Sequence, residues 1–136
     1  MANKVYPLWM KKVVEGNGPF WAGALWKAVL VDVSYVYDDA HEFLSSIAGG
    51  DRVATSAVLS SVAVLADGVI NADPAEFAAF TGADAPSLVV YHDTVGADSL
   101  KELALFFDDL TGLPVHPANV PVTMNWNTGA DKIARL

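Results

Sequence analysis

The sequence predicts a mainly β protein, an antiparallel β-sandwich or barrel of about seven or eight short strands with one or two short helices. Three observations carry this prediction. Short segments rich in apolar and β-branched residues recur along the chain, with valines that alternate in residues 26–33 and a buried-looking apolar run in residues 87–93. Turn signals such as Asp67-Gly68 separate these segments at the spacing typical of sandwiches and barrels. Hydrophobic residues make up 53% of the 136 residues, which is enough for one core.

We expect one domain over residues 1–136, which begins with a helical arm over residues 1–20. Within this arm, Pro7 suits a first helical turn and Gly16 can end the helix. The apolar residues of residues 6–15 fall close to helical spacing: Leu8, Trp9, Val13 and Val14. A short amphipathic helix is therefore predicted before the first strand.

The next elements are a strand over residues 26–33 and a second short helix. The strand is predicted because valines alternate with other residues and both of its faces are partly apolar. The helix is predicted to begin near Asp39, since Glu42 follows at the spacing of a capping box. It is expected to end at Gly49-Gly50 after two to three turns, about the minimum length of a helix in a globular protein.

The chain after Gly50 changes to a β pattern. Further strands are predicted at residues 52–60, 61–66, 87–93 and 122–126. Asp67-Gly68 predicts a hairpin, and residues 127–129 predict a turn near the end of the chain. For residues 100–108 a strand and a helix both fit the apolar pattern. Three prolines make residues 112–121 a rigid extended loop.

The charge balance excludes several classes of partner. The chain has 16 acidic and 8 basic residues, so its net charge is 8 − 16 = −8. Nucleic-acid binding and binding to anionic membranes both need clustered Lys and Arg, and the only adjacent basic pair is Lys11-Lys12. We therefore expect no nucleic-acid partner and no membrane partner. The chain has no cysteine, so disulfides and thiol chemistry are excluded.

The sequence contains no strong motif for catalysis, phosphate binding or metal binding. Gly18 and Gly23 have the gap of a phosphate-binding loop, but Ala24-Leu25 replaces the Lys and Ser/Thr that would hold phosphate and Mg²⁺. The three histidines are far apart in sequence, and no pair has the helical spacing of a metal site. A zinc site built from His92, Asp93 and His116 is the less favoured interpretation. We expect no enzymatic activity, no cofactor and no metal.

Several stretches, taken in order, resemble a family of small structural proteins of tailed-bacteriophage virions. No single stretch is specific, and their order and spacing carry the resemblance. The stretches are Tyr6-Pro7-Leu8-Trp9, residues 27–32, Tyr37 with residues 40–44, Arg52-Val53-Ala54, Asp67-Gly68-Val69, Leu88-Val89-Val90-Tyr91 with Asp93-Thr94, and residues 125–129 with Lys132-Ile133. Residues 18–26 depart from the family pattern, because they are rich in tryptophan and apolar residues where similar proteins have a polar loop.

The resemblance implies a head decoration (cement) protein that binds the major capsid protein and stabilises the capsid. It also implies a homo-oligomer, with a trimer expected, on the capsid exterior of a virion assembled in the host cytoplasm. A minor tail or head-tail connector protein is the first alternative. A carbohydrate-binding β-sandwich is the second, since exposed aromatic rings also stack on sugars.

The aromatic load has two interpretations. Trp9, Trp21, Trp26 and Trp126 are either core residues or, near Gly/Pro-rich chain, anchors for a partner. The rigid proline-containing loop is a further candidate contact surface. The predicted contact residues for the capsid or for another copy of the chain are Tyr6, Trp9, Phe20, Trp21, Leu113, Pro114, His116 and Pro117.

Overall fold

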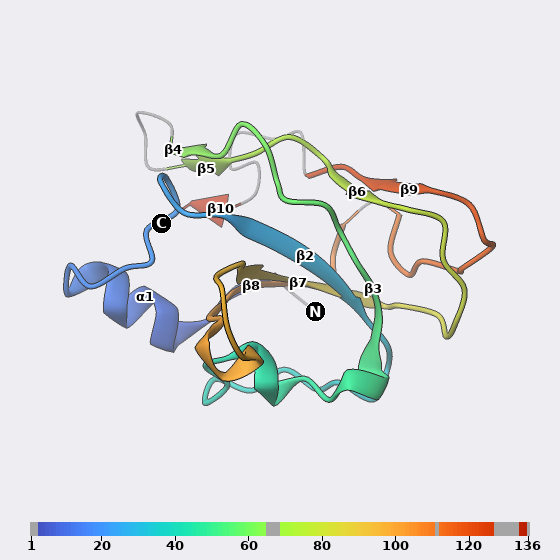
Figure 1. Cartoon of the computed structure of the whole chain (residues 1–136), viewed down its shortest axis with the longest axis horizontal. Helices are drawn as coiled ribbons and strands as arrows, with labels where there is room; N and C mark the ends of the chain where they lie inside the picture. The colour runs from blue at the N-terminus through green and yellow to red at the C-terminus, as the bar shows by residue number, and fades with distance from the viewer. Residues whose placement is uncertain (1–2, 65–68, 111, 127–133, 136) are drawn as a thin grey trace.

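Five strands form the main sheet of the computed structural model, and two small sheets lie over one of its faces (Figure 1). The structure describes residues 3–64, 69–110, 112–126 and 134–135. The main sheet has the strand order β1-β8-β7-β2-β3, and its neighbouring strands are antiparallel. The small sheets, β10-β5-β4 and β6-β9, are antiparallel as well. The predicted mainly β, antiparallel class is therefore confirmed, and the sheets of the described residues do not close into a barrel.

The strands are short. Those of the main sheet are β1 Lys4–Val5, β2 Trp26–Val31, β3 Arg52–Thr55, β7 Ser87–His92 and β8 Leu103–Phe107. Those of the small sheets are β4 Ala63–Val64, β5 Val69–Asn71, β6 Ala75–Phe77, β9 Val122–Met124 and β10 Ala134–Arg135. The helical elements are α1 Pro7–Val14 and the 3-10 turns η1 Leu44–Ser46, η2 Gly49–Asp51 and η3 Asp98–Leu100.

The three central strands β2, β7 and β8 account for the most apolar stretches of the sequence. They are covered on both faces, and almost all of their residues are buried. The whole of β2 pairs with β7, from Trp26 opposite His92 to Val31 opposite Ser87. Strand pairing also decides between the strand and the helix predicted for residues 100–108. This segment contains the strand β8, which pairs with β7 on one side and with β1 on the other.

Neighbouring residues of β8 show that the core has two layers. Side chains alternate between the faces of a strand. The ring of Phe107 lies 5.4 Å from that of Trp126, on the side of the small sheets. The ring of Phe106 lies 5.2 Å from Tyr37 and 6.3 Å from Tyr35, on the side of the loops after β2. One layer therefore lies between the sheets, and the other lies between the main sheet and residues 32–51.

The prediction of a helix that begins near Asp39 is wrong. The backbone of this segment pairs with a distant part of the chain: the Leu44 amide donates to the Lys101 carbonyl at 2.7 Å, and the Leu103 amide donates to the Glu42 carbonyl at 2.9 Å. These amide and carbonyl groups are therefore not available for helical hydrogen bonds. Only the 3-10 turns η1 and η2 form here, and the capping box is not used.

Arg52 holds these turns in place without a regular helix. Its guanidinium donates to the carbonyls of Leu44 at 2.9 Å and Ile47 at 2.7 Å, and to Asp98 Oδ2 at 2.7 Å. One side chain on β3 thus joins η1 to η3. The guanidinium also lowers the pKa of the Asp98 carboxyl, by its hydrogen bond and its charge.

The predicted N-terminal helix is confirmed as α1, with a proline in its first turn. Its last turn is followed by Gly16, whose φ of +80° suits a residue without a side chain. The arm before α1 pairs within its own chain: β1 lies along β8, and the Tyr6 amide donates to the Ala104 carbonyl at 2.8 Å. It therefore completes the main sheet of its own chain.

The predicted hairpin is present as the antiparallel pair β4 and β5, with Val64 opposite Ile70. Its turn at Asp67-Gly68 lies outside the described residues, as does the turn predicted at residues 127–129. The strands predicted at residues 52–60, 61–66 and 122–126 are shorter than expected. Among the described residues, no helix has the length and apolar character needed to cross a bilayer.

Candidate functional site

Large exposed apolar side chains from two neighbouring segments surround one pocket. Residues 17–25, here called the Phe20 loop, and residues 92–95 line an open pocket of about 560 Å³. At this pocket Phe20 is 48% exposed, Leu25 is 58% exposed and Val95 is 95% exposed. Large apolar side chains that gather around one hollow typically mark an interaction site. This surface is the first candidate site.

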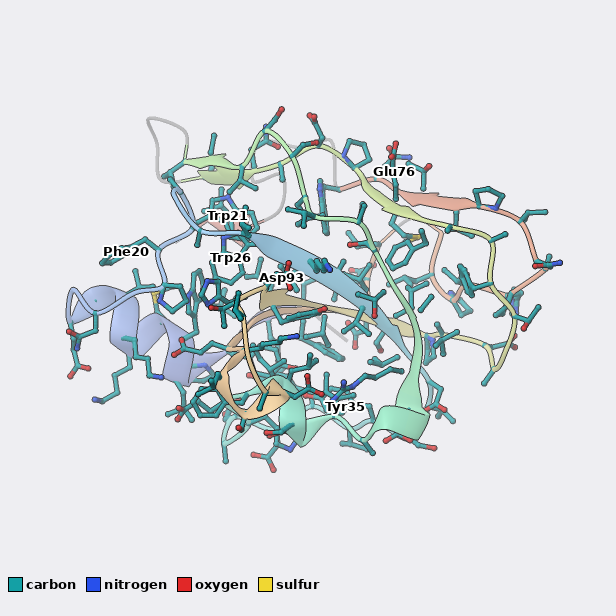
Figure 2. All side chains as sticks on the ribbon, viewed as in Figure 1. Phe20, Trp21, Trp26, Tyr35, Glu76 and Asp93 are labelled. Carbon is teal, nitrogen blue, oxygen red and sulfur yellow. The ribbon has the colours of Figure 1, made fainter. Side chains whose placement is uncertain are left out.

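Three tryptophans fix the backbone behind this surface. Trp26 stacks on Trp21 with ring centroids 5.1 Å apart, and the rings of Trp9 and Trp26 form a T-shaped pair with centroids 5.6 Å apart. Each indole N–H donates to a carbonyl: Trp9 to Pro19 at 2.8 Å, Trp26 to Trp21 at 2.9 Å, and Trp21 to Asn71 of β5 at 3.1 Å. In Figure 2 Trp21 and Trp26 point into the molecule, while Phe20 points away from it. The cluster therefore holds the Phe20 loop in one shape, as a preorganised binding surface requires.

Three of the predicted contact residues are core residues instead. Tyr6, Trp9 and Trp21 are each 2% exposed or less. Their polar atoms have partners inside the protein, such as the Tyr35 hydroxyl 2.6 Å from that of Tyr6. A buried aromatic ring with its polar atom satisfied stabilises the fold and does not reach a partner. These three aromatic residues are therefore core residues and not anchors for a partner. Among the aromatic residues predicted to make contacts, Phe20 is the exposed one.

The floor of the pocket carries little net charge. The Asp93 amide donates to the Leu25 carbonyl at 2.8 Å, which closes the Phe20 loop onto the end of β7. Lys27 Nζ lies 3.7 Å from Asp93 Oδ2, so these two charges offset each other. The ring of His92 lies 5.5 Å from Trp26, and burial lowers the pKa of His92 against the opposing effect of Glu102 and Asp93. His92 is therefore neutral at pH 7.

The second candidate site is the loop over residues 112–121, here called the proline loop. Its middle pairs with residue 85: the Val115 amide donates to the Ala85 carbonyl at 2.8 Å, and the reverse bond is 2.9 Å. The Asn119 amide donates to the Phe80 carbonyl at 3.0 Å. Val115 is buried. The predicted contact residues of this loop are at the surface, with Pro114 and His116 exposed and Leu113 and Pro117 half-buried.

The two candidate sites are separate. The Phe20 loop lies beside α1 at one end of the long axis, and the proline loop lies at the other end, next to β9 (Figure 1). His116 belongs to the second end, where its Nδ1 atom lies 3.0 Å from Asp84 Oδ2. His92 and Asp93 belong to the first, so the less favoured zinc site is not assembled. Among the residues that the structure describes, no group of three His, Asp or Glu is placed to hold a metal ion.

A polar cluster joins α1 to the neighbouring elements beside the Phe20 loop. Lys12 Nζ lies 2.6 Å from Glu102 Oε1 and 3.1 Å from Glu42 Oε2. Burial lowers the pKa of Lys12, but the hydrogen bonds to the two carboxylates outweigh this effect and raise the pKa. The lysine therefore stays protonated and ties α1 to the residue before β8 and to the chain before η1. This cluster positions α1, and with it Trp9, behind the Phe20 loop.

Sequence reasoning missed Leu25 and Val95. Both are ordinary aliphatic residues, and nothing in their immediate neighbours distinguishes them from core residues. One signal was available: residues 16–26 contain no charged residue, although the chain has a net charge of −8. A long uncharged segment with several glycines indicates a loop that meets another apolar surface.

Comparison of the sequence with models of known protein families finds no match, and comparison with curated proteins finds no significant relative.

Proposed function

We propose that this chain is a structural protein of a tailed-bacteriophage virion. It decorates the head, binds the major capsid protein and stabilises the capsid, and it acts as a homo-oligomer with three copies at a local threefold axis. It works by binding and not by turnover. Its place is the capsid exterior, after synthesis in the host cytoplasm.

The observation that carries the proposal is the preorganised apolar surface at the Phe20 loop. A protein that must hold its neighbours through many repeated contacts benefits from rigid apolar anchors, because little conformational freedom is lost when they bind. Phe20 and Leu25 supply such anchors on a backbone that indole hydrogen bonds hold, and Val95 adds an exposed apolar side chain from the neighbouring segment. The proline loop adds a second rigid surface at the far end.

The resemblance along the chain supports the same proposal. The matching stretches include Tyr6-Pro7-Leu8-Trp9 and residues 27–32, which correspond to the start of α1 and most of β2. They therefore fall on the elements that form the core. The residues that depart from the family pattern, 18–26, include most of the Phe20 loop. A common core with a differing contact loop is what we expect when related proteins bind different capsids.

A position in the tail or connector is the alternative within the virion, since it requires the same kind of binding surface. A carbohydrate-binding role has less support. The flat faces of Trp9, Trp21 and Trp26 are buried, so stacking on sugar rings at the pocket would depend on Phe20.

The test is co-sedimentation of the purified protein with capsids that lack it. We expect saturable binding at a simple ratio of this protein to capsid subunits, and about a tenfold or greater loss of affinity for Phe20→Asp. Val36→Asp is the matched control, because Val36 is 73% exposed on the loops after β2. If the protein is present in whole particles but does not bind heads, it belongs to the tail or connector. If it is absent from particles, the proposal fails.

A further inference from the structure

We infer that copies of this protein bind each other head to tail, with the Phe20 loop of one copy against the proline loop of the next. The inference specifies the self-association that the proposed function includes, and so rests on it. Self-association is tested in the absence of capsids, so that a failure of this inference is distinguishable from a failure of the proposed capsid binding.

The first argument is the distribution of charge along the chain. Residues 16–26 contain no acidic, basic or histidine residue, and residues 112–121 contain His116 alone. The chain as a whole carries a net charge of −8. The two loops are therefore long uncharged segments of a strongly acidic protein, and they lie at opposite ends of it (Figure 1).

This distribution favours a second copy as the partner. Two copies that each carry −8 repel each other, and like charges brought together at a contact are costly. The uncharged ends are where two copies can meet with the least repulsion. Beside the Phe20 loop, Lys27 Nζ lies 3.7 Å from Asp93 Oδ2, so these two charges offset each other.

The second argument is the form of the two surfaces. The Phe20 loop borders a pocket of about 560 Å³, with the side chains of Leu25 and Val95 at its rim. The proline loop forms the opposite end of the molecule and exposes Pro114 and Val120, the latter by 52%. Both loop backbones are held by hydrogen bonds, so the pocket and the proline loop keep their shapes in the free chain. One end can therefore receive the other.

The placement of the surfaces determines the kind of assembly. Because the two surfaces differ, the contact between copies is heterologous, and each copy uses a different face toward each of its two neighbours. Such a contact either closes into a ring or continues as a filament. A closed ring of three copies is the arrangement that the proposed threefold position requires.

The experiment is sedimentation velocity of the full chain from about 1 μM to about 1 mM, at about 10 mM and about 500 mM NaCl. We expect concentration-dependent association that is at least about tenfold tighter at high salt, because salt screens the repulsion between the acidic copies. Leu25→Lys and Val120→Asp, one at each end, should each weaken association at least about tenfold by placing an unpaired charge in the contact. Val33→Asp, at a side chain 80% exposed elsewhere, should have no such effect.

Mixing the two variants tests the head-to-tail arrangement. In the mixture, the unaltered Phe20 loop of the Val120→Asp chain can bind the unaltered proline loop of the Leu25→Lys chain, so the mixture should associate although neither variant does so alone. Three results would each overturn the inference: a wild-type chain that is monomeric under all conditions, association that Leu25→Lys abolishes while Val120→Asp leaves it unchanged, or a mixture that stays monomeric. Circular dichroism of each variant confirms that it is folded.

Discussion

The Phe20 loop and the proline loop are both uncharged or nearly so, exposed and fixed, but they are fixed by different means. One backbone bond, from Asp93 to Leu25, closes the end of the Phe20 loop, but indole N–H groups of Trp9 and Trp26 hold the rest of it, so its shape depends largely on side chains. The proline loop is held by backbone hydrogen bonds to Ala85 and Phe80. A loop held by side chains is sensitive to single substitutions, whereas a loop held by its backbone tolerates them.

The largest effect is expected for Trp21→Ala. The Trp21 side chain is 2% exposed and stacks on Trp26, so its removal leaves a cavity in the core. We expect a loss of about 3–5 kcal/mol in the free energy of unfolding. Urea unfolding followed by circular dichroism measures this loss. A change below about 1 kcal/mol would show that Trp21 does not belong to the core.

A smaller effect is expected for Trp9→Phe, which removes one indole N–H. The Pro19 carbonyl loses its donor, while a ring still packs against Trp26. We expect a loss of about 1 kcal/mol in the free energy of unfolding. Hydrogen exchange should become faster in residues 17–25 and stay unchanged in residues 112–121. Equal acceleration in both loops would contradict the independence of their supports.

The pH dependence should also separate the two ends. Burial lowers the pKa of His92 in the folded chain below the ordinary value of 6.5, which the unfolded chain retains. At a pH between the folded and the unfolded pKa, the unfolded chain therefore binds more protons than the folded one. Stability is therefore highest above pH 6.5 and falls as the pH decreases through this window. We expect this part of the pH profile to be lost in His92→Gln, as measured by thermal unfolding between about pH 5 and 8. An unchanged profile would contradict the role assigned to burial.

The smallest effect is expected for His116→Gln at the proline loop. The side chains of His116 and Asp84 are 71% and 64% exposed, and exposed ion pairs contribute little. We expect a change within about 0.5 kcal/mol in the free energy of unfolding. A larger loss would mean that this pair, and not the backbone pairing of Val115, holds the proline loop.

Local sequence patterns predicted those elements for which local preference and long-range contacts favour the same secondary structure. Alternating valines indicated β2 and a short apolar run indicated β7 correctly, and Pro7 with Gly16 marked both ends of α1. The helix expected from Asp39 failed because Leu44 and Leu103 use backbone bonds to distant residues. A capping box indicates a local preference, and such pairing overrides it.

The candidate site was only partly predictable. Phe20 and the proline loop were predicted as contact residues and lie at the surface. Trp21 was not distinguishable from Phe20 by sequence, because the direction of a side chain in an irregular loop depends on its packing partners. The partner carbonyl of Trp21, on Asn71, is 50 residues away along the chain. Such a contact leaves no signal in local spacing.

Cryo-electron microscopy of capsids reconstituted with the purified protein tests the central claim most directly. The account predicts ordered density for this protein on the outside of the head, at a threefold position. In that density the Phe20 loop of each copy would contact the proline loop of the next. Heads without added density, or copies that lie apart with both loops exposed to solvent, would contradict it.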